Sequence, residues 1–189
     1  MNKADTPKNY VILKRCKYSN YRYSMTAVSK HHIESIRLWR NDQVEVLRQN
    51  GEITKQNQVE YYKTVVWPEL LLSEPGRLLF SFFKGSEFIG YGGLVHIDWK
   101  KMSAEMSFIL STKRMKNVIQ YQEDLENFIS ILKGLAFSEL GFEKIVTETY
   151  SFRKLTIDIL EKSDFIIDPT AERCKSDSNC ESIFHCLMA

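Results

Sequence analysis

Residues near the middle of the chain have side chains suited to moving a proton. Glu105 lies in the mostly apolar stretch "AEMSFIL". A carboxylate on such a strand beside a cleft has its pKa raised toward neutrality by desolvation, as a general base requires. His96 and Asp98, in "LVHID", fall on one face of a strand because side chains repeat every two residues. We interpret Glu105 and His96 as candidate bases. The alternatives are an outward-facing Glu105 and a structural His96–Asp98 pair.

A cationic stretch precedes a long helical pattern and has the chemistry to hold phosphate. Lys113, Arg114 and Lys116 stand in "STKRMKNVIQYQED". The first amides of a helix are unpaired and its dipole favours an anion, so side-chain cations there reinforce the site. The stretch has no glycine, and Asn117 is the residue best suited to a left-handed conformation. We expect these four residues to bind a phosphate-bearing cofactor. The alternative is a surface loop whose cations face water.

A third group of residues is suited to recognising a substrate. The segment "RLWRND" contains Arg37, Trp39, Arg40 and Asn41. Arginine binds phosphate or carboxylate through two parallel hydrogen bonds, and tryptophan stacks on a base or sugar. We assign these residues, with Asp98, to substrate binding. The alternative is a core tryptophan with arginines on the helix surface.

The composition indicates one globular domain. The chain has 189 residues, of which 43% are hydrophobic and 26% charged, and its formal net charge is only +2. These values give no reason to expect nucleic acid or a membrane as the partner. No apolar run is long enough to cross a bilayer and the polar start lacks a secretion signal, so we expect the cytoplasm. Cys16, Cys174, Cys180 and Cys186 are expected to be free thiols, because the spacing of a zinc site is missing and no metal is expected.

Hydrophobic periodicity predicts a mixed α/β domain, with a mostly antiparallel central sheet flanked by helices, over residues 24–189. Residues 1–23 are expected to form an irregular extension. The expected order of elements is β, α, α, β, β, β, α, β, α, β. The segments that carry it are 23–42 (strand, then short helix), 54–71 (helix), 76–98 (hairpin), 104–110 (strand), 120–140 (helix), 143–150 (strand), 153–165 (helix) and 181–188 (strand). Thr54 is the expected N-cap of the second helix, Pro68 ends or kinks it, and Gly141 ends the long helix.

This order resembles the GNAT superfamily of acyl-CoA dependent N-acetyltransferases from about Ser24 to Leu187. The matching pieces are "LWRND", "FIGYGGLVHID", "AEMSFIL", "LKGLAFSELGFEKIVTETY" and "ILEKSDF". The "WRN" and "LAFSELGFEKI" segments look most like the branch that contains ribosomal-protein N-terminal and amino-sugar nucleotide acetyltransferases. Fold-level resemblance does not fix a substrate.

The resemblance implies a site. Acetyl-CoA would be the donor, with its pyrophosphate at the cationic stretch and its pantetheine paired with the backbone of Phe108, Ile109 and Leu110. Glu105 matches the general base of several members, and Tyr150 is a candidate proton donor to the thiolate. The usual donor, the tyrosine of "YEKxGF", is replaced by Leu160.

The resemblance also implies a function. We expect an N-acetyltransferase that acts on a small primary amine, with a nucleotide-linked amino sugar as one candidate acceptor, and a homodimer as one candidate assembly. Two alternatives stay open. One is acetylation of a protein N-terminus; the other is a non-catalytic module on the same fold with a decayed cofactor loop.

Overall fold

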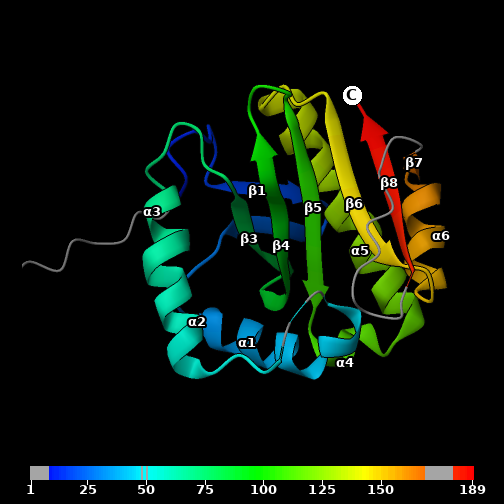
Figure 1. Cartoon of the computed structure of the whole chain (residues 1–189), viewed down its shortest axis with the longest axis horizontal. Helices are drawn as coiled ribbons and strands as arrows, with labels where there is room; N and C mark the ends of the chain where they lie inside the picture. The colour runs from blue at the N-terminus through cyan, green and yellow to red at the C-terminus, as the bar shows by residue number, and fades with distance from the viewer. Residues whose placement is uncertain (1–8, 48, 50, 169–180) are drawn as a thin grey trace, which may run out of the picture.

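The computed structural model describes residues 9–47, 49, 51–168 and 181–189, and within them one mixed sheet forms the centre of the molecule (Figure 1). It has eight strands in the order β1-β2-β3-β4-β5-β6-β8-β7. Their bounds are β1 Lys17–Asn20, β2 Tyr23–Ala27, β3 Leu78–Lys84, β4 Glu87–Asp98, β5 Ser103–Leu110, β6 Lys144–Tyr150, β7 Ile166–Ile167 and β8 Ser182–Met188. Neighbouring strands in the described parts of the chain are antiparallel except β5 and β6, which are parallel. The predicted fold class is confirmed.

Residues 9–23 are more ordered than the sequence suggested. Residues 1–23 were predicted to be an irregular extension, but Lys17–Asn20 pairs with β2, and the side chains of Tyr10, Leu13 and Tyr18 are buried in the core. The Tyr10 hydroxyl accepts a hydrogen bond of 2.8 Å from the Leu79 backbone N–H. The prediction was wrong because this segment is too short and too rich in tyrosine to show a clear period.

Helices connect and cover the strands (Figure 1). Their bounds are α1 Ile33–Asp42, α2 Lys55–Tyr61, α3 Trp67–Glu69, α4 Thr112–Met115, α5 Val118–Lys133 and α6 Lys154–Lys162, with a 3-10 turn at Val44–Val46 and π-helical turns at Tyr62–Val66 and Gly134–Glu139. The predicted cap is confirmed, since the Thr54 hydroxyl accepts from the Asn57 backbone N–H at 3.1 Å. Helical backbone continues through Pro68 for one residue before it ends, and Gly141, at φ +72°, follows the long helix as expected.

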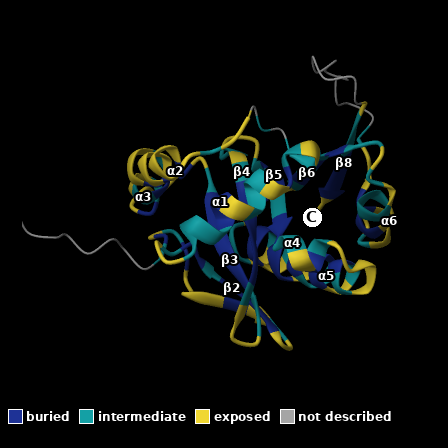
Figure 2. Ribbon diagram, turned by 90° about the horizontal axis from the view of Figure 1, so that it is seen from below, coloured by how far each residue is buried: buried dark blue, intermediate teal, exposed yellow. Residues whose placement is uncertain are grey.

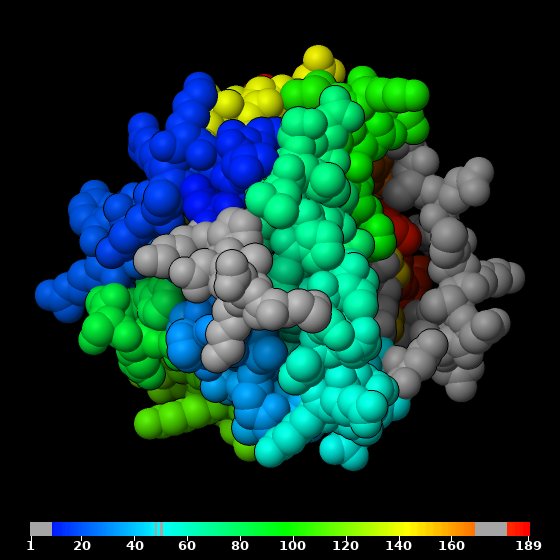
Figure 3. All heavy atoms as spheres, turned by 90° about the vertical axis from the view of Figure 1, so that its left-hand side faces the viewer, coloured from blue at the N-terminus to red at the C-terminus, as the bar shows by residue number. Residues whose placement is uncertain are grey.

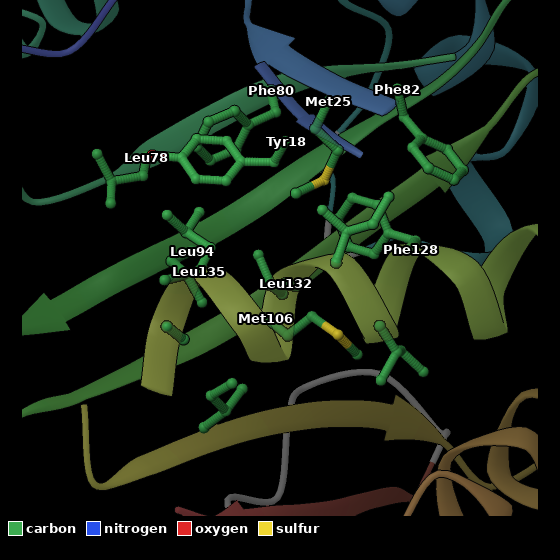
Figure 4. Close-up of a cluster of buried hydrophobic side chains, with 14 of the residues drawn as sticks. Tyr18, Met25, Leu78, Phe80, Phe82, Leu94, Met106, Phe128, Leu132 and Leu135 are labelled. Atoms are coloured by element: carbon green, nitrogen blue, oxygen red, sulfur yellow. The ribbon is translucent and has the colours of Figure 1, made fainter. Parts of the chain in front are cut away.

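Two hydrophobic clusters fix the helices to opposite faces of the sheet. One contains α5 and α6 with Phe82, Met106 and Phe128, and Figure 4 shows these side chains between the strands and α5. The rings of Phe82 and Phe128 meet edge to face at 5.3 Å. The other cluster packs Ile36 of α1 and Tyr62 against Ile109. In Figure 2 the strands are mostly buried, whereas the outer sides of α2 and α3 are exposed.

The segment from α2 to α3 forms an outer wall of the molecule. In Figure 3 it runs as a cyan to green band beside the dark blue N-terminal residues. A backbone hydrogen bond of 2.9 Å from Val11 to Leu70 joins the two segments. This wall closes one side of the site described below.

The third and fourth strands form the predicted hairpin, but β4 is irregular near its end. Gly85, at φ +61°, lies in the turn. The register of β4 against β5 shifts between Val95 and Asp98, and His96 has φ +50°. A bulge of this kind places an extra residue on one strand and re-aims its side chains. Two-residue alternation therefore fails between His96 and Asp98.

Candidate active site

The site begins where β5 and β6 separate. The two strands pair only from Ser103 with Lys144 to Glu105 with Val146, although both continue beyond these residues. A cavity of about 670 Å³ lies at this divergence. Its walls come from both faces of the sheet. On one face it reaches α1 and α2, and on the other α5 and α6.

Strand alternation determines which residues of β5 direct their backbone N–H and C=O groups toward β4 and which toward the gap. The Ser111 N–H bonds to the Ile89 carbonyl at 2.8 Å, so Ser111 faces β4. In an antiparallel pair such residues alternate, so Ile109 also bonds toward β4, whereas Met106, Phe108 and Leu110 direct their amides and carbonyls toward the gap. Of the three residues expected to hold pantetheine, Ile109 therefore directs its backbone groups toward β4 and not toward the gap. Its side chain is buried in the core.

Glu105 occupies the last paired position of β5 and lines the cavity. Its side chain is only 16% exposed, and its carboxylate lies 4.0 Å from Nε2 of His96. His96, 75% exposed at the bulge, lines the same cavity. The predicted association of His96 with Asp98 was wrong, because the bulge turns His96 toward Glu105 instead.

Asp98 stabilises a turn and does not line the cavity. Its Oδ1 accepts hydrogen bonds of 3.0 Å from the backbone N–H groups of Lys100 and Lys101. The hydrogen bonds from these backbone N–H groups, with that from Lys101 having the largest effect, lower the pKa of the Asp98 carboxyl. The assignment of Asp98 to substrate binding is therefore corrected.

A further carboxylate and a tyrosine come from β6. Because Val146 is opposite Glu105 in register, alternation places Glu148 and Tyr150 on the same face of the sheet as Glu105. Both line the cavity. The Tyr150 ring stacks on Phe152 at 5.5 Å. The cavity therefore has carboxylates from adjacent strands on the face that meets α1 and α2.

Guanidinium groups from other elements line the same cavity as these carboxylates. Arg40 of α1 and Arg77, which precedes β3, line the cavity together with Tyr61. Arg77 is paired with Glu69 at 2.9 Å and donates to the Tyr61 hydroxyl at 2.7 Å. Arg40 uses its Nε to donate to the Gln49 side chain at 3.0 Å. Arg40 is the member of the predicted substrate set that lines the cavity.

The other members of that set have structural roles. Arg37 is nearly buried, and its guanidinium binds both carboxylate oxygens of Glu34 and the Ile53 carbonyl. Asn41 both donates to the Ile53 carbonyl and accepts from the Ile53 N–H, each at 2.9 Å. Trp39 packs on Phe88 at 4.8 Å in the second core cluster. The structure gives these three residues packing and backbone-binding roles, and none of them lines the cavity.

Arg114 does not face a ligand. It forms two hydrogen bonds with the carboxylate of Asp124, at 2.6 and 2.8 Å, and the Asp124 side chain is fully buried. Tyr23 donates to the same carboxylate at 2.9 Å. The hydrogen bonds with Asp124 raise the pKa of Arg114. The Arg114 guanidinium is therefore paired within the protein, and Arg114 lines neither cavity described here.

The remaining residues of the cationic stretch lie near the starts of α4 and α5. Lys113 and Lys116 are exposed. Asn117 is the N-cap of α5 with φ −103°, so it is not left-handed, and its side-chain oxygen accepts from the Gln120 N–H at 3.1 Å. This cap leaves the Val118 and Ile119 amides at the start of a 16-residue helix.

A second cavity of about 360 Å³ lies between the starts of α5 and α6. Three residues line both cavities, namely Tyr121, Arg153 and Thr156. The Tyr121 hydroxyl bonds to Thr156 and accepts from Arg153, each at 2.9 Å. Lys154 also lines the second cavity. A guanidinium and an ammonium thus line this cavity together with Tyr121 of the first turn of α5.

Some of these residues were missed by sequence reasoning although a signal existed. Glu148 follows from alternation in "KIVTETY", once Glu105 is aligned with Val146. Arg153 stands at the start of a helix close to Tyr150. No sequence pattern points to Arg77, because its place in the cavity depends on the packing of α2 and α3 against the sheet.

The predicted free thiols can be located for two of the four cysteines. Cys186 is buried in β8, where burial raises the pKa of its thiol, and Cys16 is exposed. Cys174 and Cys180 lie outside the described residues. Within the described ranges no group of three His, Cys, Asp or Glu side chains is arranged to hold a metal, and no helix there is long and apolar enough to span a membrane.

Comparisons with known proteins agree with this architecture. The model of the acetyltransferase (GNAT) domain matches residues 25–181. A spermidine N-acetyltransferase from Vibrio cholerae, in complex with CoA and spermine, is similar in structure with a TM-score of 0.72 and 13% identity, covering 89% of this chain and 96% of that chain. A dodecameric spermidine N-acetyltransferase from the same organism gives 0.69 and 14%, covering 89% and 95%. No curated protein matches the chain at a significant level.

Proposed function

The chain belongs to the GNAT acetyltransferase family, and on that basis we propose that it transfers an acetyl group from acetyl-CoA to a small primary amine in the cavity between β5 and β6. Members of this family use acetyl-CoA as the acetyl donor. One observation carries the proposal. Glu105 lies at the last paired position of β5 and lines the cavity, whose walls come from both faces of the sheet.

In this proposal Glu105 takes the proton from the acceptor amine. Its carboxylate lines the cavity and is mostly shielded from water, with His96 at 4.0 Å as a second titratable group. A base must lie within hydrogen-bond reach of the proton it removes, either directly or through one water. An amine that enters from the α1 and α2 side meets Glu105 before it reaches the divergence of the strands.

The proton for the departing thiolate would come from Tyr150. Leu160 is apolar and buried, so α6 offers no proton donor at that position. Tyr150 lines the cavity on the same strand as Glu148. A thiol has a pKa of roughly 8.5, so its thiolate is a tolerable leaving group and the donor contributes less than the base.

The residues around the two cavities suit CoA. When bound, acetyl-CoA supplies the acetyl group as a thioester. The backbone of Met106 and Phe108 faces the gap and would pair with amides of the pantetheine arm. The first amides of α5, together with Arg153 and Lys154, would hold the phosphates, with Lys113 and Lys116 adding charge at the surface. Arg153 and Lys154 thus take the role first expected of Arg114.

The charges of the larger cavity favour an acceptor that carries an amine and an anionic group. Glu105 and Glu148 suit the amine, and Arg40, which lines the same cavity, suits a phosphate or carboxylate. A nucleotide-linked amino sugar has this combination, which keeps the amino-sugar branch as our leading proposal.

A second acceptor class is favoured by a different observation. Two carboxylates on one face also suit a polyamine, and the similar Vibrio cholerae enzymes are spermidine N-acetyltransferases. A protein N-terminus is a third class. Thiol release from acetyl-CoA, measured with nucleotide-linked amino sugars, spermine and short peptides, separates the three.

Calorimetry with CoA tests the proposal before any acceptor is known. We expect heat from a single site. No heat from CoA or acetyl-CoA would contradict the enzyme and favour a non-catalytic module.

Substitution of Glu105 then tests the base. Glu105→Gln should reduce turnover strongly at neutral pH and less at high pH, where amines lose their proton unaided. General-base catalysis contributes about 10²- to 10⁴-fold, which sets the expected loss. An unchanged pH profile would remove Glu105 from this role.

A further inference from the structure

The C-terminal end of α1 contacts the place where β5 turns into α4. Gln43, the residue after α1, donates from Nε2 to the Leu110 carbonyl at 2.8 Å. Asp42 accepts a hydrogen bond of 2.7 Å from the Thr112 hydroxyl. Gln43 is only 5% exposed, whereas Asp42 is exposed. Figure 1 shows α1 and α4 close together below the end of β5.

The hydrogen bond from Gln43 to the Leu110 carbonyl replaces one that a paired neighbouring strand would supply. Leu110 directs its carbonyl toward the gap, and β6 does not pair with β5 beyond Glu105. A buried carbonyl without a partner costs free energy comparable to a lost hydrogen bond, so the end of a diverging strand needs another donor. The Gln43 amide is that donor.

The junction lies between the two parts of the proposed coenzyme site. Phe108, whose backbone faces the gap, is two residues before Leu110, and the starts of α4 and α5 follow Thr112. A glycine-rich loop would set the path from strand to helix by its own backbone conformation. In this glycine-free stretch, side chains of α1 fix the path instead.

The same helix end also supports the acceptor side of the cavity. Arg40 lines the cavity, and Asn41 binds the backbone of Ile53. Residues 40–43 therefore contact the cavity wall, the loop before α2 and the β5–α4 junction in turn. The segment first interpreted as substrate-binding connects the two halves of the site.

We propose that Gln43, assisted by Asp42, is a positioning residue for the coenzyme: its amide holds the Leu110 carbonyl so that the backbone of β5 and the first amides of α5 bind CoA together. The inference rests on the proposed function, because it concerns the same CoA site. It assigns no catalytic step to Gln43.

A matched pair of variants tests this role. Gln58 is 4% exposed and makes an equivalent bond of 2.9 Å from Nε2 to the Ile33 carbonyl, at the opposite end of α1. Gln43→Met and Gln58→Met each remove one buried amide donor at nearly constant length. We expect similar decreases in melting temperature for both, but an approximately fivefold higher Kd for CoA by calorimetry only in Gln43→Met, the size of one net hydrogen bond.

The outcomes separate this inference from the proposed function. If the unsubstituted protein binds no CoA, the proposed function fails. If it binds CoA and Gln43→Met binds equally well, or if both variants weaken binding by the same factor, the positioning role is overturned. Exposed Asp42 gives a second test if Gln43→Met does not fold. Asp42→Ala should raise the Kd and Asp42→Asn, which keeps an acceptor for Thr112, should restore it; equal Kd values for both would contradict the role.

Discussion

Removal of Arg114 should destabilise the fold and have little direct effect on the coenzyme. Arg114 and Asp124 form a nearly buried, bidentate ion pair, with N···O distances of 2.6 and 2.8 Å. In Arg114→Ala the Asp124 carboxylate would stay fully buried, with the Tyr23 hydroxyl as its remaining partner among the contacts described above. An uncompensated buried charge is far more costly than an exposed one.

The expected loss is large relative to the stability of a domain of this size. Removing one partner of a buried pair typically costs about 3–5 kcal/mol, against a total unfolding free energy of about 5–15 kcal/mol. Urea unfolding followed by circular dichroism measures it directly. Replacing both partners, in Arg114→Met with Asp124→Leu, should recover most of the loss, since buried pairs exchanged for apolar residues are often neutral.

Lys113 supplies the control, because it is the adjacent cation and is exposed. Lys113→Ala should change the unfolding free energy by less than about 0.5 kcal/mol. The reasoning is refuted if Arg114→Ala loses less than about 1 kcal/mol while its affinity for CoA falls. In that case Arg114 would face the ligand in solution, as the sequence first suggested.

Two further predictions concern other parts of the fold. Gly93, at φ +147°, has no room for a Cβ beside the Leu78 carbonyl, so Gly93→Ala should lower the free energy of unfolding by at least about 2 kcal/mol. The control is Gly134→Ala, where a Cβ meets open space in a helical segment; thermal melts should show it to be neutral or stabilising. Burial lowers the pKa of His185, against an opposing effect of Glu161 at 3.9 Å, so the unfolded state binds the proton more tightly and stability should fall as pH drops below about 6.5. Unfolding at pH 7.5 and 5.5 should show a smaller difference in His185→Leu; an identical difference would exclude His185 as the cause.

The elements with strong periodicity could be predicted from the sequence. The hairpin of β3 and β4, the strand β5 and the long helix α5 were all expected near their observed positions. Their apolar spacing reflects burial, which also determines the fold. Glu105 was expected to face a cleft, and it lines the larger cavity. Its role as the base stays a prediction.

The errors arose where a single residue decides the local structure. The bulge at His96 depends on the positive φ of that one residue, which hydrophobic periodicity does not reveal. Arg37 and Asn41 bind the backbone near Ile53, a partner set by a loop that the sequence does not place. The partner of Arg114 did leave a signal. Asp124 stands in the buried stripe of α5 beside Leu125 and Phe128, where an acid requires a cation.

The alternation of β5 and β6 gives the proposed acetyl transfer one face for the acceptor and another for the coenzyme. Glu105 and Glu148 point to the face covered by α1 and α2, whereas Met106 and Thr147 point to the face covered by α5 and α6. An amine that enters from the first face meets carboxylates. In the proposed function, a coenzyme arm along the separated backbone edges would approach from the other face, with its phosphates toward α5. Because the strands still pair at Glu105 and separate beyond it, our proposal makes this residue the base and leaves Tyr150, further along β6, to protonate the thiolate.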